Sequence, residues 1–308
     1  MRGEYSYFHA VPEQMKRFLL PTFDYKEDHS RASYSMEHLV VPDVALQLVH
    51  DALSTDGYIK LIENFFAFIR DRSCRTVGRE AVLEAGRRQI AQKMHDRLDQ
   101  LLSTATGKRL DTILTASGPF GGERDMEVRS AELIDAALRD YQGTELAVSH
   151  GDPCFSNILF DAQIGLFRLI DPRGAEEASA AEMHPLYDIA KFSHSILGGY
   201  DFVNSDLFDC KYDADLGLYL SVDHSGIDTV AQTAFGSQVK KLGISLRNVR
   251  SVELSLFMSM LPLHADHPRK LLGFALIACR VIEELEHAEG GKLRKAKQNI
   301  PGLVRGRT

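Results

Sequence analysis

Residues 150–171 read HGDPCFSNILFDAQIGLFRLID, and two short apolar runs stand out within them, at 158–160 and 166–170. The residues between the runs include an aspartate and a glycine, which are typical of turns. The pattern therefore predicts a β-hairpin. Its first strand begins directly after Asn157 and its second ends directly before Asp171, so we expect both side chains at the open end of the hairpin.

A third polar residue, Asp152, precedes Asn157 by five positions. Phosphoryl transfer needs a carboxylate that orients and deprotonates the attacking hydroxyl, and two hard oxygen ligands that hold Mg²⁺ against the nucleotide phosphates. Asp152 is the candidate for the first role, and Asn157 and Asp171 are the candidates for the second. Gly151 permits tight backbone geometry beside the carboxylate, and we expect His150 to anchor the loop by hydrogen bonding.

The run from His150 to Leu159, together with Leu169-Ile170-Asp171-Pro172, resembles the catalytic and metal-binding segments of aminoglycoside phosphotransferases and choline kinases. That group is a branch of the protein-kinase-like fold in which HGD replaces HRD. The resemblance covers roughly residues 4–290. It implies an α+β, two-lobe fold with a reduced N-terminal lobe and a mostly helical C-terminal lobe that carries the catalytic hairpin. It also implies ATP and Mg²⁺ as cofactors and a small-molecule hydroxyl as acceptor, with precursors of sugar or surface-polysaccharide metabolism as the candidate class. The preference for ATP over GTP stays open.

Two further segments resemble parts of the same family. The segment from Ser35 to Leu39 is similar to the hinge strand, which implies that the backbone of Glu37, His38 and Leu39 receives the adenine. Tyr187-Asp188-Ile189-Ala190-Lys191 is similar to the helix whose aspartate braces the catalytic loop, which assigns that role to Asp188. An acidic residue in the first turn of a helix also has a simpler explanation, because it is stabilised there by the helix dipole.

The N-terminus departs from the family pattern. Family members begin with a nucleotide-covering loop and a lysine strand, and the lysine pairs with a glutamate on the following helix. The best match to that glutamate is Glu4, and the three residues before it leave no room for either element. Three interpretations stay open: a shortened enzyme, an enzyme that completes its site in another way, or a catalytically impaired pseudokinase-like module that binds nucleotide or a protein. Metal-dependent hydrolysis by the same carboxylates is a weaker interpretation, because no His-rich ligand set accompanies them.

The rest of the chain is organised around this segment. Residues 33–41 read as a strand that stops at Pro42. Apolar residues at three- and four-residue spacing then predict amphipathic helices, at 44–52, 58–70, 80–102, 128–141, 187–197, 229–242, 248–261 and 269–288. We therefore predict a partial N-lobe with the hinge at 1–42, a helical C-lobe at 43–291, and a basic, disordered tail at 292–308.

Composition narrows the class of protein. The chain has 308 residues and a formal net charge of −7, which argues against nucleic-acid binding because that needs clustered Lys and Arg. Its four cysteines form no CxxC pair, which argues against a zinc ribbon or a disulfide framework. We see neither a membrane-spanning run nor a secretory leader, and expect a cytoplasmic protein without a membrane partner. The oligomeric state cannot be read from the sequence.

Two features carry open alternatives. Arg173, two residues after Asp171, is placed either to reach a substrate or phosphate or to lie on the surface. The stretch from 201 to 228 holds seven aspartates and one lysine with interleaved aromatic residues. It reads either as an acidic, aromatic-lined acceptor site for a cationic or polyhydroxylated molecule, or as a solvated loop.

Overall fold

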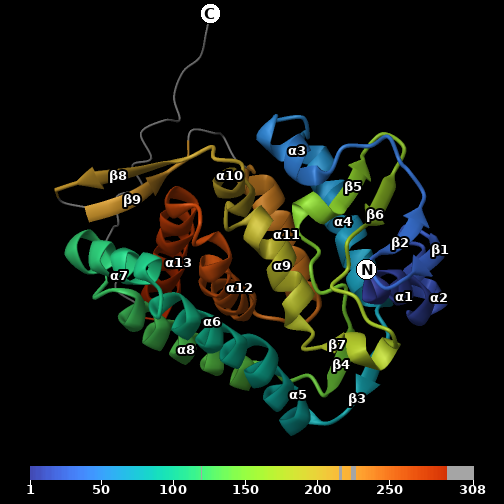
Figure 1. The fold of residues 1–308 in the computed structure, drawn as a ribbon, viewed down its shortest axis with the longest axis horizontal. Helices are drawn as coiled ribbons and strands as arrows, with labels where there is room; N and C mark the ends of the chain where they lie inside the picture. Colours follow the sequence, from blue (N-terminus) through green and yellow to red (C-terminus); the bar gives the residue numbers. More distant parts are fainter. Residues whose placement is uncertain (119, 215–216, 223–226, 290–308) are drawn as a thin grey trace, which may run out of the picture.

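The computed structural model describes residues 1–289 except 119, 215–216 and 223–226. Within this part, the N-terminal segment lies beside the β5–β6 hairpin, and helices fill most of the remainder (Figure 1). The predicted basic tail at 292–308 falls outside the described residues. No helix in the described ranges is long and apolar enough to cross a membrane.

The elements follow one another in a mixed α and β order. The helices are α1 (Arg2–Ala10), α2 (Glu13–Lys16), α3 (Val44–Val49), α4 (Thr55–Asp71), α5 (Arg79–Gly86), α6 (Lys93–Leu102), α7 (Ala105–Ser117), α8 (Glu123–Asp140), α9 (Leu186–Ile196), α10 (Tyr200–Asn204), α11 (Thr229–Lys241), α12 (Leu246–Met260) and α13 (Pro268–Glu289). A π-helical segment, η1 (Arg87–Gln92), joins α5 to α6, and three 3₁₀ turns are η2 (Phe155–Asn157), η3 (Ala178–Ala181) and η4 (Leu261–His264). The strands are β1 (Thr22–Glu27), β2 (Ala32–Met36), β3 (Cys74–Thr76), β4 (Glu145–Val148), β5 (Ile158–Asp161), β6 (Leu166–Leu169), β7 (Glu182–Met183), β8 (Asp209–Asp213) and β9 (Gly217–Ser221).

The predicted hairpin is β5–β6, an antiparallel pair in which Ile158 lies opposite Leu169. Both of its edges are held. On the β6 side, the amide of Leu169 donates to the carbonyl of Phe18 (2.7 Å). On the β5 side, the Gln47 side chain of α3 donates to the carbonyl of Phe160 (2.8 Å). Because the hairpin is fixed from both sides, its open end is a rigid base for the residues that flank it.

The strand predicted at 33–41 is correct only in its first part. β2 ends at Met36, which pairs with Thr22, the first residue of β1. Beyond this pair the partner chain continues into Pro21, which has no amide hydrogen to donate. The residues after Met36 run as an unpaired connection until Asp43, which bridges Leu159 just before α3. Val40 within this connection is 90% exposed. The local alternation resembled a strand, but the length of the partner strand decides where pairing stops.

The second sheet delivers the chain to the catalytic loop. It is antiparallel in the order β3-β4-β7, and β4 ends at Val148, just before residues 149–157. The amide of Ser149 then donates to the carbonyl of Ala181 (2.9 Å). The loop therefore starts from a paired strand and ends at another, β5.

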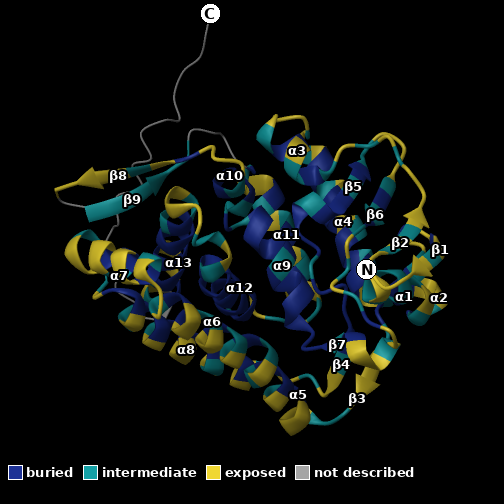
Figure 2. Ribbon diagram, viewed as in Figure 1, coloured by how far each residue is buried: buried dark blue, intermediate teal, exposed yellow. Residues whose placement is uncertain are grey.

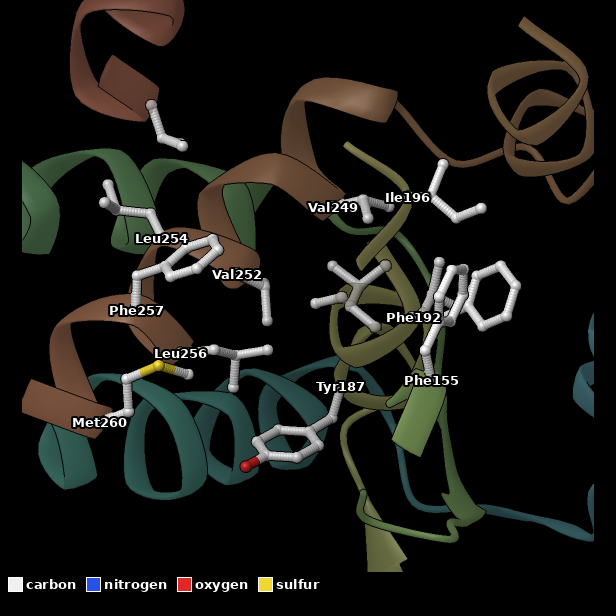
Figure 3. Packing of buried hydrophobic residues seen from close by; sticks show 14 of the residues in the cluster. Phe155, Tyr187, Phe192, Ile196, Val249, Val252, Leu254, Leu256, Phe257 and Met260 are labelled. Atoms are coloured by element: carbon white, nitrogen blue, oxygen red, sulfur yellow. The ribbon is translucent and has the colours of Figure 1, made fainter. Parts of the chain in front are cut away.

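The core forms where α9 packs against α12 and α4. Figure 2 shows these helices largely buried, and Figure 3 shows side chains of α9 and α12 meeting across their interface. The rings of Phe65 on α4 and Phe192 on α9 stack at 3.9 Å between centroids. Phe155 of the catalytic loop packs edge-on against Phe192 at 5.4 Å. The loop is thus anchored in the centre of the protein by an apolar side chain that is fully buried.

Several elements of the fold were not predicted, among them helix α7 and the β8–β9 hairpin. Helix α7 has few apolar residues, and of these Leu110 and Leu114 are buried, so its periodicity is weak. The β8–β9 hairpin lies within the acidic stretch, whose aspartates disfavour strands.

Candidate active site

The loop between β4 and β5 is a tight structure with internal hydrogen bonds. The amide of Cys154 donates to the carbonyl of Asp152, and the amide of Asn157 donates to that of Cys154, each at 2.9 Å. The side-chain nitrogen of Asn157 donates to the carbonyl of Asp152 (2.9 Å). Gly151 has a φ of +82°, a region that favours glycine. These contacts fold the five-residue spacing into one turn.

Asp188, the third residue of α9, lies beneath this turn. Its carboxylate is fully buried and accepts hydrogen bonds from the amides of His150 (3.0 Å) and Gly151 (2.9 Å). The guanidinium of Arg72, 4% exposed, pairs with the same carboxylate at 3.3 Å. Arg72 also donates to the carbonyl of Pro185 (3.2 Å), so one buried cation ties the helix start to the loop. This geometry is what a loop-bracing role for Asp188 requires.

Asp152 forms an ion pair that sequence reasoning did not find. Its carboxylate lies 2.8 Å from the ammonium of Lys191, one turn further along α9. Burial opposes ionisation of Asp152, but the charge and hydrogen bond of Lys191 outweigh burial, and the pKa of the carboxyl falls below its ordinary value. Asp152 is therefore a carboxylate whose direction is set by a fixed ammonium. The available signal was a lysine three residues after Asp188 in the same predicted helix.

Asn157 and Asp171 are brought together by the hairpin. The amide of Ile170, the residue before Asp171, donates to the carbonyl of Asn157 (3.0 Å). Asp171 has a left-handed backbone, with φ +54°, a conformation that aspartate tolerates better than most residues. Burial raises the pKa of its carboxyl, and the negative charges of Glu4 and Asp152 act in the same direction. Three carboxylates thus face one region.

These residues fit a magnesium ion in their donor chemistry. The amide nitrogen of Asn157 is already used, which leaves its oxygen as the free end. Among the described residues, none forms a hydrogen bond or an ion pair with the Asp171 side chain. The charges of Glu4 and Asp152, which act on its carboxylate, are negative like its own. The described part of the chain also holds no cluster of three His, Cys, Asp or Glu side chains suited to a metal. One carboxylate and one amide match an ion that takes its other ligands from water and phosphates.

The three hinge residues, Glu37, His38 and Leu39, lie in the unpaired connection after β2. Within the described ranges their backbone makes no backbone–backbone hydrogen bond. Their peptide groups are therefore available to an external partner. A small, mainly apolar cavity lies behind this connection, lined by Met36 of β2, by residues of α1 and by 169–172.

His150 is fully buried and its ring contacts the ring of Tyr7 edge-on at 6.2 Å. Its Nδ1 accepts from the amide of Asp152 (3.3 Å). Burial lowers the pKa of the imidazole. A neutral ring that accepts from the loop backbone is consistent with the anchoring role expected of it.

Arg173 lies against the catalytic loop. Its amide donates to the carbonyl of His150 (2.9 Å), and its side chain runs over Gly151, where an added Cβ would lie 2.8 Å from the Cβ of Arg173. Its guanidinium donates to the hydroxyl of Tyr187 (2.8 Å). Arg173 therefore lies beside Asp152, and in the described part of the chain its guanidinium forms no ion pair with an acidic side chain.

The acidic stretch at 201–228 uses several of its carboxylates in structural contacts. Asp206 pairs with Lys270 (3.2 Å) and Asp209 with Arg269 (3.3 Å). Asp228 caps α11, accepting from the amide of Ala231 (2.8 Å). Asp201 is buried at the start of α10. These contacts favour a structural explanation of the described aspartates over an acidic acceptor site.

Comparison with known proteins agrees with this architecture. No protein-family model matches the chain, and no curated protein matches its sequence. Among solved structures, a glucosamine kinase (crystal form B) superposes with a TM-score of 0.53 at 15% identity, over 90% of this chain and 70% of that one. A thermostable mutant of the aminoglycoside phosphotransferase APH(4)-Ia, in its apo form, gives a TM-score of 0.51 at 12% identity, over 94% of this chain and 84% of that one. The chain has a kinase-like fold.

The predicted α+β, kinase-like fold class is therefore confirmed, with a mostly helical body that carries the β5–β6 hairpin. At identities this low, the comparisons establish the kinase-like fold and leave the activity to the site itself. The boundaries at residues 42 and 291 stay predictions, as do the roles assigned to the site residues. The candidate site also contains two residues to which no motif assigned a role, Arg72 and Lys191, because each is defined by a partner far away in the sequence.

Proposed function

We propose that this chain is an ATP-dependent kinase that transfers the γ-phosphate of ATP to a hydroxyl group of a small molecule in the cytoplasm. The observation that carries the proposal is the arrangement of Asp152, Asn157 and Asp171 at the open end of one fixed hairpin. The solved structures of similar fold support it, since they are named as kinases of glucosamine and of aminoglycosides.

Each side chain has a role that follows from its environment. Asp152, ionised and oriented by Lys191, accepts the proton of the acceptor hydroxyl and directs its oxygen toward the phosphate. Asn157 and Asp171 would hold Mg²⁺, which supplies the charge that neutralises the nucleotide phosphates. Glu37, His38 and Leu39 offer backbone groups to the adenine. Asp188 keeps the loop amides fixed, so that Asp152 does not have to be ordered during the reaction.

The first test is thermal unfolding with and without Mg-ATP. A ligand present at one hundred times its Kd adds about 2.7 kcal/mol to the free energy of unfolding. We expect this gain for the wild-type chain only when Mg²⁺ is present, and its loss in Asp171→Asn. The matched control is Asp161→Asn, which makes the same change at the turn of the same hairpin, where the carboxylate accepts from the amides of Gln163 (2.8 Å) and Ile164 (3.3 Å).

The second test is phosphate transfer to a panel of hydroxyl acceptors. Asp152→Asn should lower the rate by about a hundredfold to ten-thousandfold and leave Mg-ATP binding in place, because general-base catalysis contributes on that scale. Absence of any Mg²⁺-dependent stabilisation by ATP in the wild-type chain would refute the proposal. Stabilisation without transfer to any acceptor would instead support the catalytically impaired, nucleotide-binding module.

A further inference from the structure

A second cavity, of about 380 Å³, lies between the η1–α6 segment and the loop after β6. Four of its six lining residues are cationic. The lining consists of Arg88, Gln89, Lys93, Arg97, Arg173 and Met183. The volume lies in the range of small-molecule sites in proteins. None of the residues proposed for catalysis or magnesium binding belongs to it.

The positive charge of this cavity is not balanced by acidic side chains. Among the described residues, none of the four cations forms an ion pair. Glu182 on β7, the residue before the lining residue Met183, pairs with Arg75, whose Nε lies 2.8 Å from its carboxylate. Burial lowers the pKa of Lys93, and the charges of Arg173 and Arg97 act in the same direction. Like charges gathered in a half-buried cavity repel one another unless an anion joins them.

Part of the cavity wall is held in place by hydrogen bonds. Arg88 and Gln89 belong to the π-helical segment η1, a type of helix distortion found frequently at functional sites. Gln89 bonds to β7 through both ends of its amide, accepting from the amide of His184 (2.9 Å) and donating to the carbonyl of Glu182 (3.2 Å). These two bonds tie η1 to the segment 182–184, which contributes Met183 to the cavity wall.

Tyr187 of α9 brings two of the cations together. Its hydroxyl accepts from Lys93 (2.9 Å) and from Arg173 (2.8 Å). Figure 3 shows the Tyr187 ring extending from α9 toward the helix of residues 93–102, with the hydroxyl at its far end. Burial opposes ionisation of the phenol, but the surrounding charges, Lys191 and Arg173 foremost, lower its pKa. Lys93 and Arg173 are therefore held next to each other by a buried side chain.

The cavity adjoins the catalytic loop. The side chain of Arg173 covers Gly151, the residue directly before Asp152. Tyr187 and Lys191 lie on the same face of α9, one turn or about 6 Å apart, and Lys191 is the ion-pair partner of Asp152. A group bound among the cations would thus lie within the length of a small molecule from the carboxylate.

We infer that this cavity binds an anionic group, a phosphate or a carboxylate, of the hydroxyl acceptor. The inference rests on the proposed function for the acceptor role, and it narrows the substrate class to anionic hydroxyl compounds. Four uncompensated cations repel an amine, so the acceptor differs in charge from the glucosamine and aminoglycosides named for the structures of similar fold.

The test uses inorganic phosphate as the probe, without nucleotide or magnesium, at constant ionic strength maintained with chloride. Phosphate should raise the midpoint of thermal unfolding of the wild-type chain in a saturable manner. Arg88→Glu should weaken phosphate binding at least tenfold, because a charge-assisted contact is replaced by repulsion. Arg88 makes no described hydrogen bond or ion pair, so this variant is expected to fold. Arg88→Lys should retain most of the affinity.

The matched control is Arg109→Glu, the same charge reversal at an exposed position of α7. It should bind phosphate as the wild-type chain does. Equal weakening in both variants would show a general effect of net charge and overturn the inference, as would the absence of saturable phosphate binding. Acetate as a second probe separates carboxylate from phosphate recognition, and glucose 6-phosphate, glucuronate and glucose as competitors extend the comparison to hydroxylated molecules. Competition by neutral glucose alone would contradict the inference.

A final arm separates this inference from the proposed function. Mg-ATP should stabilise Arg88→Glu as much as the wild-type chain, since the nucleotide is proposed to lie at the hinge and Asp171. Stabilisation by Mg-ATP without phosphate binding overturns only the anionic acceptor. A parallel loss of Mg-ATP and phosphate binding in Arg88→Glu would assign the cavity to the nucleotide phosphates and overturn the inference as well.

Discussion

Replacing Asp188 by asparagine perturbs the brace beneath the catalytic loop with almost no change in shape. In the folded protein the Asp188 carboxylate accepts from the amides of His150 and Gly151 and pairs with Arg72 at 3.3 Å. Asparagine offers one acceptor oxygen and one NH₂ group. One loop amide would therefore face another donor, and the Arg72 guanidinium would lose its counter-ion.

The magnitude follows from burial. The side chains of Arg72 and Asp188 are 4% and 0% exposed. Removing one partner of a buried ion pair costs about 3–5 kcal/mol, because the remaining charge stays desolvated. For a chain of this size, a loss of 1 kcal/mol lowers the melting temperature by about 2 °C. We expect Asp188→Asn to melt about 6–10 °C below the wild-type protein.

Two measurements check this. Calorimetry or circular dichroism gives the melting temperature, and hydrogen exchange reports on the amides of His150 and Gly151 directly. Exchange at these two amides should accelerate by about a hundredfold, the equivalent of roughly 3 kcal/mol. The control is Asp135→Asn, where partly exposed pairs with Arg87 (39% and 32% exposed) and with Arg139 are lost, each at a cost below about 1 kcal/mol.

The reasoning is refuted if Asp188→Asn melts within 1 °C of the wild-type protein and its loop amides exchange at wild-type rates. Arg72→Met provides a further distinction. It removes the charge partner but leaves the two amide bonds, so it should lower the melting temperature and leave amide exchange at His150 and Gly151 little changed.

Three other predictions concern separate features. Lys191→Met should retain stabilisation by Mg-ATP and lower the transfer rate by about ten- to a hundredfold, because Asp152 loses the ammonium that orients it. Burial raises the pKa of Glu123 from 4.5 to about 8, so the free energy of unfolding should fall by about 4 kcal/mol as the pH rises from 4.5 to 8 and be flatter in Glu123→Gln. Gly174→Ala should destabilise the protein by at least about 2 kcal/mol, because at φ +87° its Cβ would lie 2.7 Å from the backbone of α1.

The pH prediction and the glycine prediction have matched control variants, and the Lys191 prediction has an outcome that contradicts it. A transfer rate unchanged in Lys191→Met would show that the ion pair does not serve the reaction. For the pH effect, Glu132→Gln alters an exposed glutamate of the same helix and should leave the slope unchanged. For the glycine, Gly165→Ala at the hairpin turn meets no atom within 4 Å at φ +68°, so it should cost only the backbone strain of about 1 kcal/mol.

The fold was predictable where local pattern and tertiary structure agree. The hairpin strands at 158–160 and 166–170 and the helices with strong periodicity form within a few residues of the predicted bounds. Helix α7 was missed because packing of Leu110 and Leu114, rather than a continuous apolar stripe, stabilises it. The strand after residue 36 was wrong because pairing depends on how far β1 extends, which the residues of β2 do not encode.

The candidate site was predictable as far as one contiguous segment carries it. Asp152, Asn157 and Asp171 lie on the same loop and hairpin, so their proximity follows from sequence spacing. Lys191 and the four cations of the second cavity could not be predicted in this way. They come from segments up to 85 positions apart, Arg88 to Arg173, and only tertiary packing places their charges together.

Helix α9 has a consequence for the regiochemistry of the proposed reaction. Its first two turns carry Tyr187 beside the cationic cavity, Asp188 beneath the loop and Lys191 on the catalytic carboxylate. Because a helix is stiff, the spacing of these residues along α9 fixes the separation between an anchored anion and the hydroxyl that reacts. Among otherwise similar acceptors, the enzyme would select by the distance between these two groups. A one-residue insertion between Asp188 and Lys191 would turn Lys191 by about 100° relative to Tyr187 and Asp188, and so separate the partner of Asp152 from the anchor and the brace.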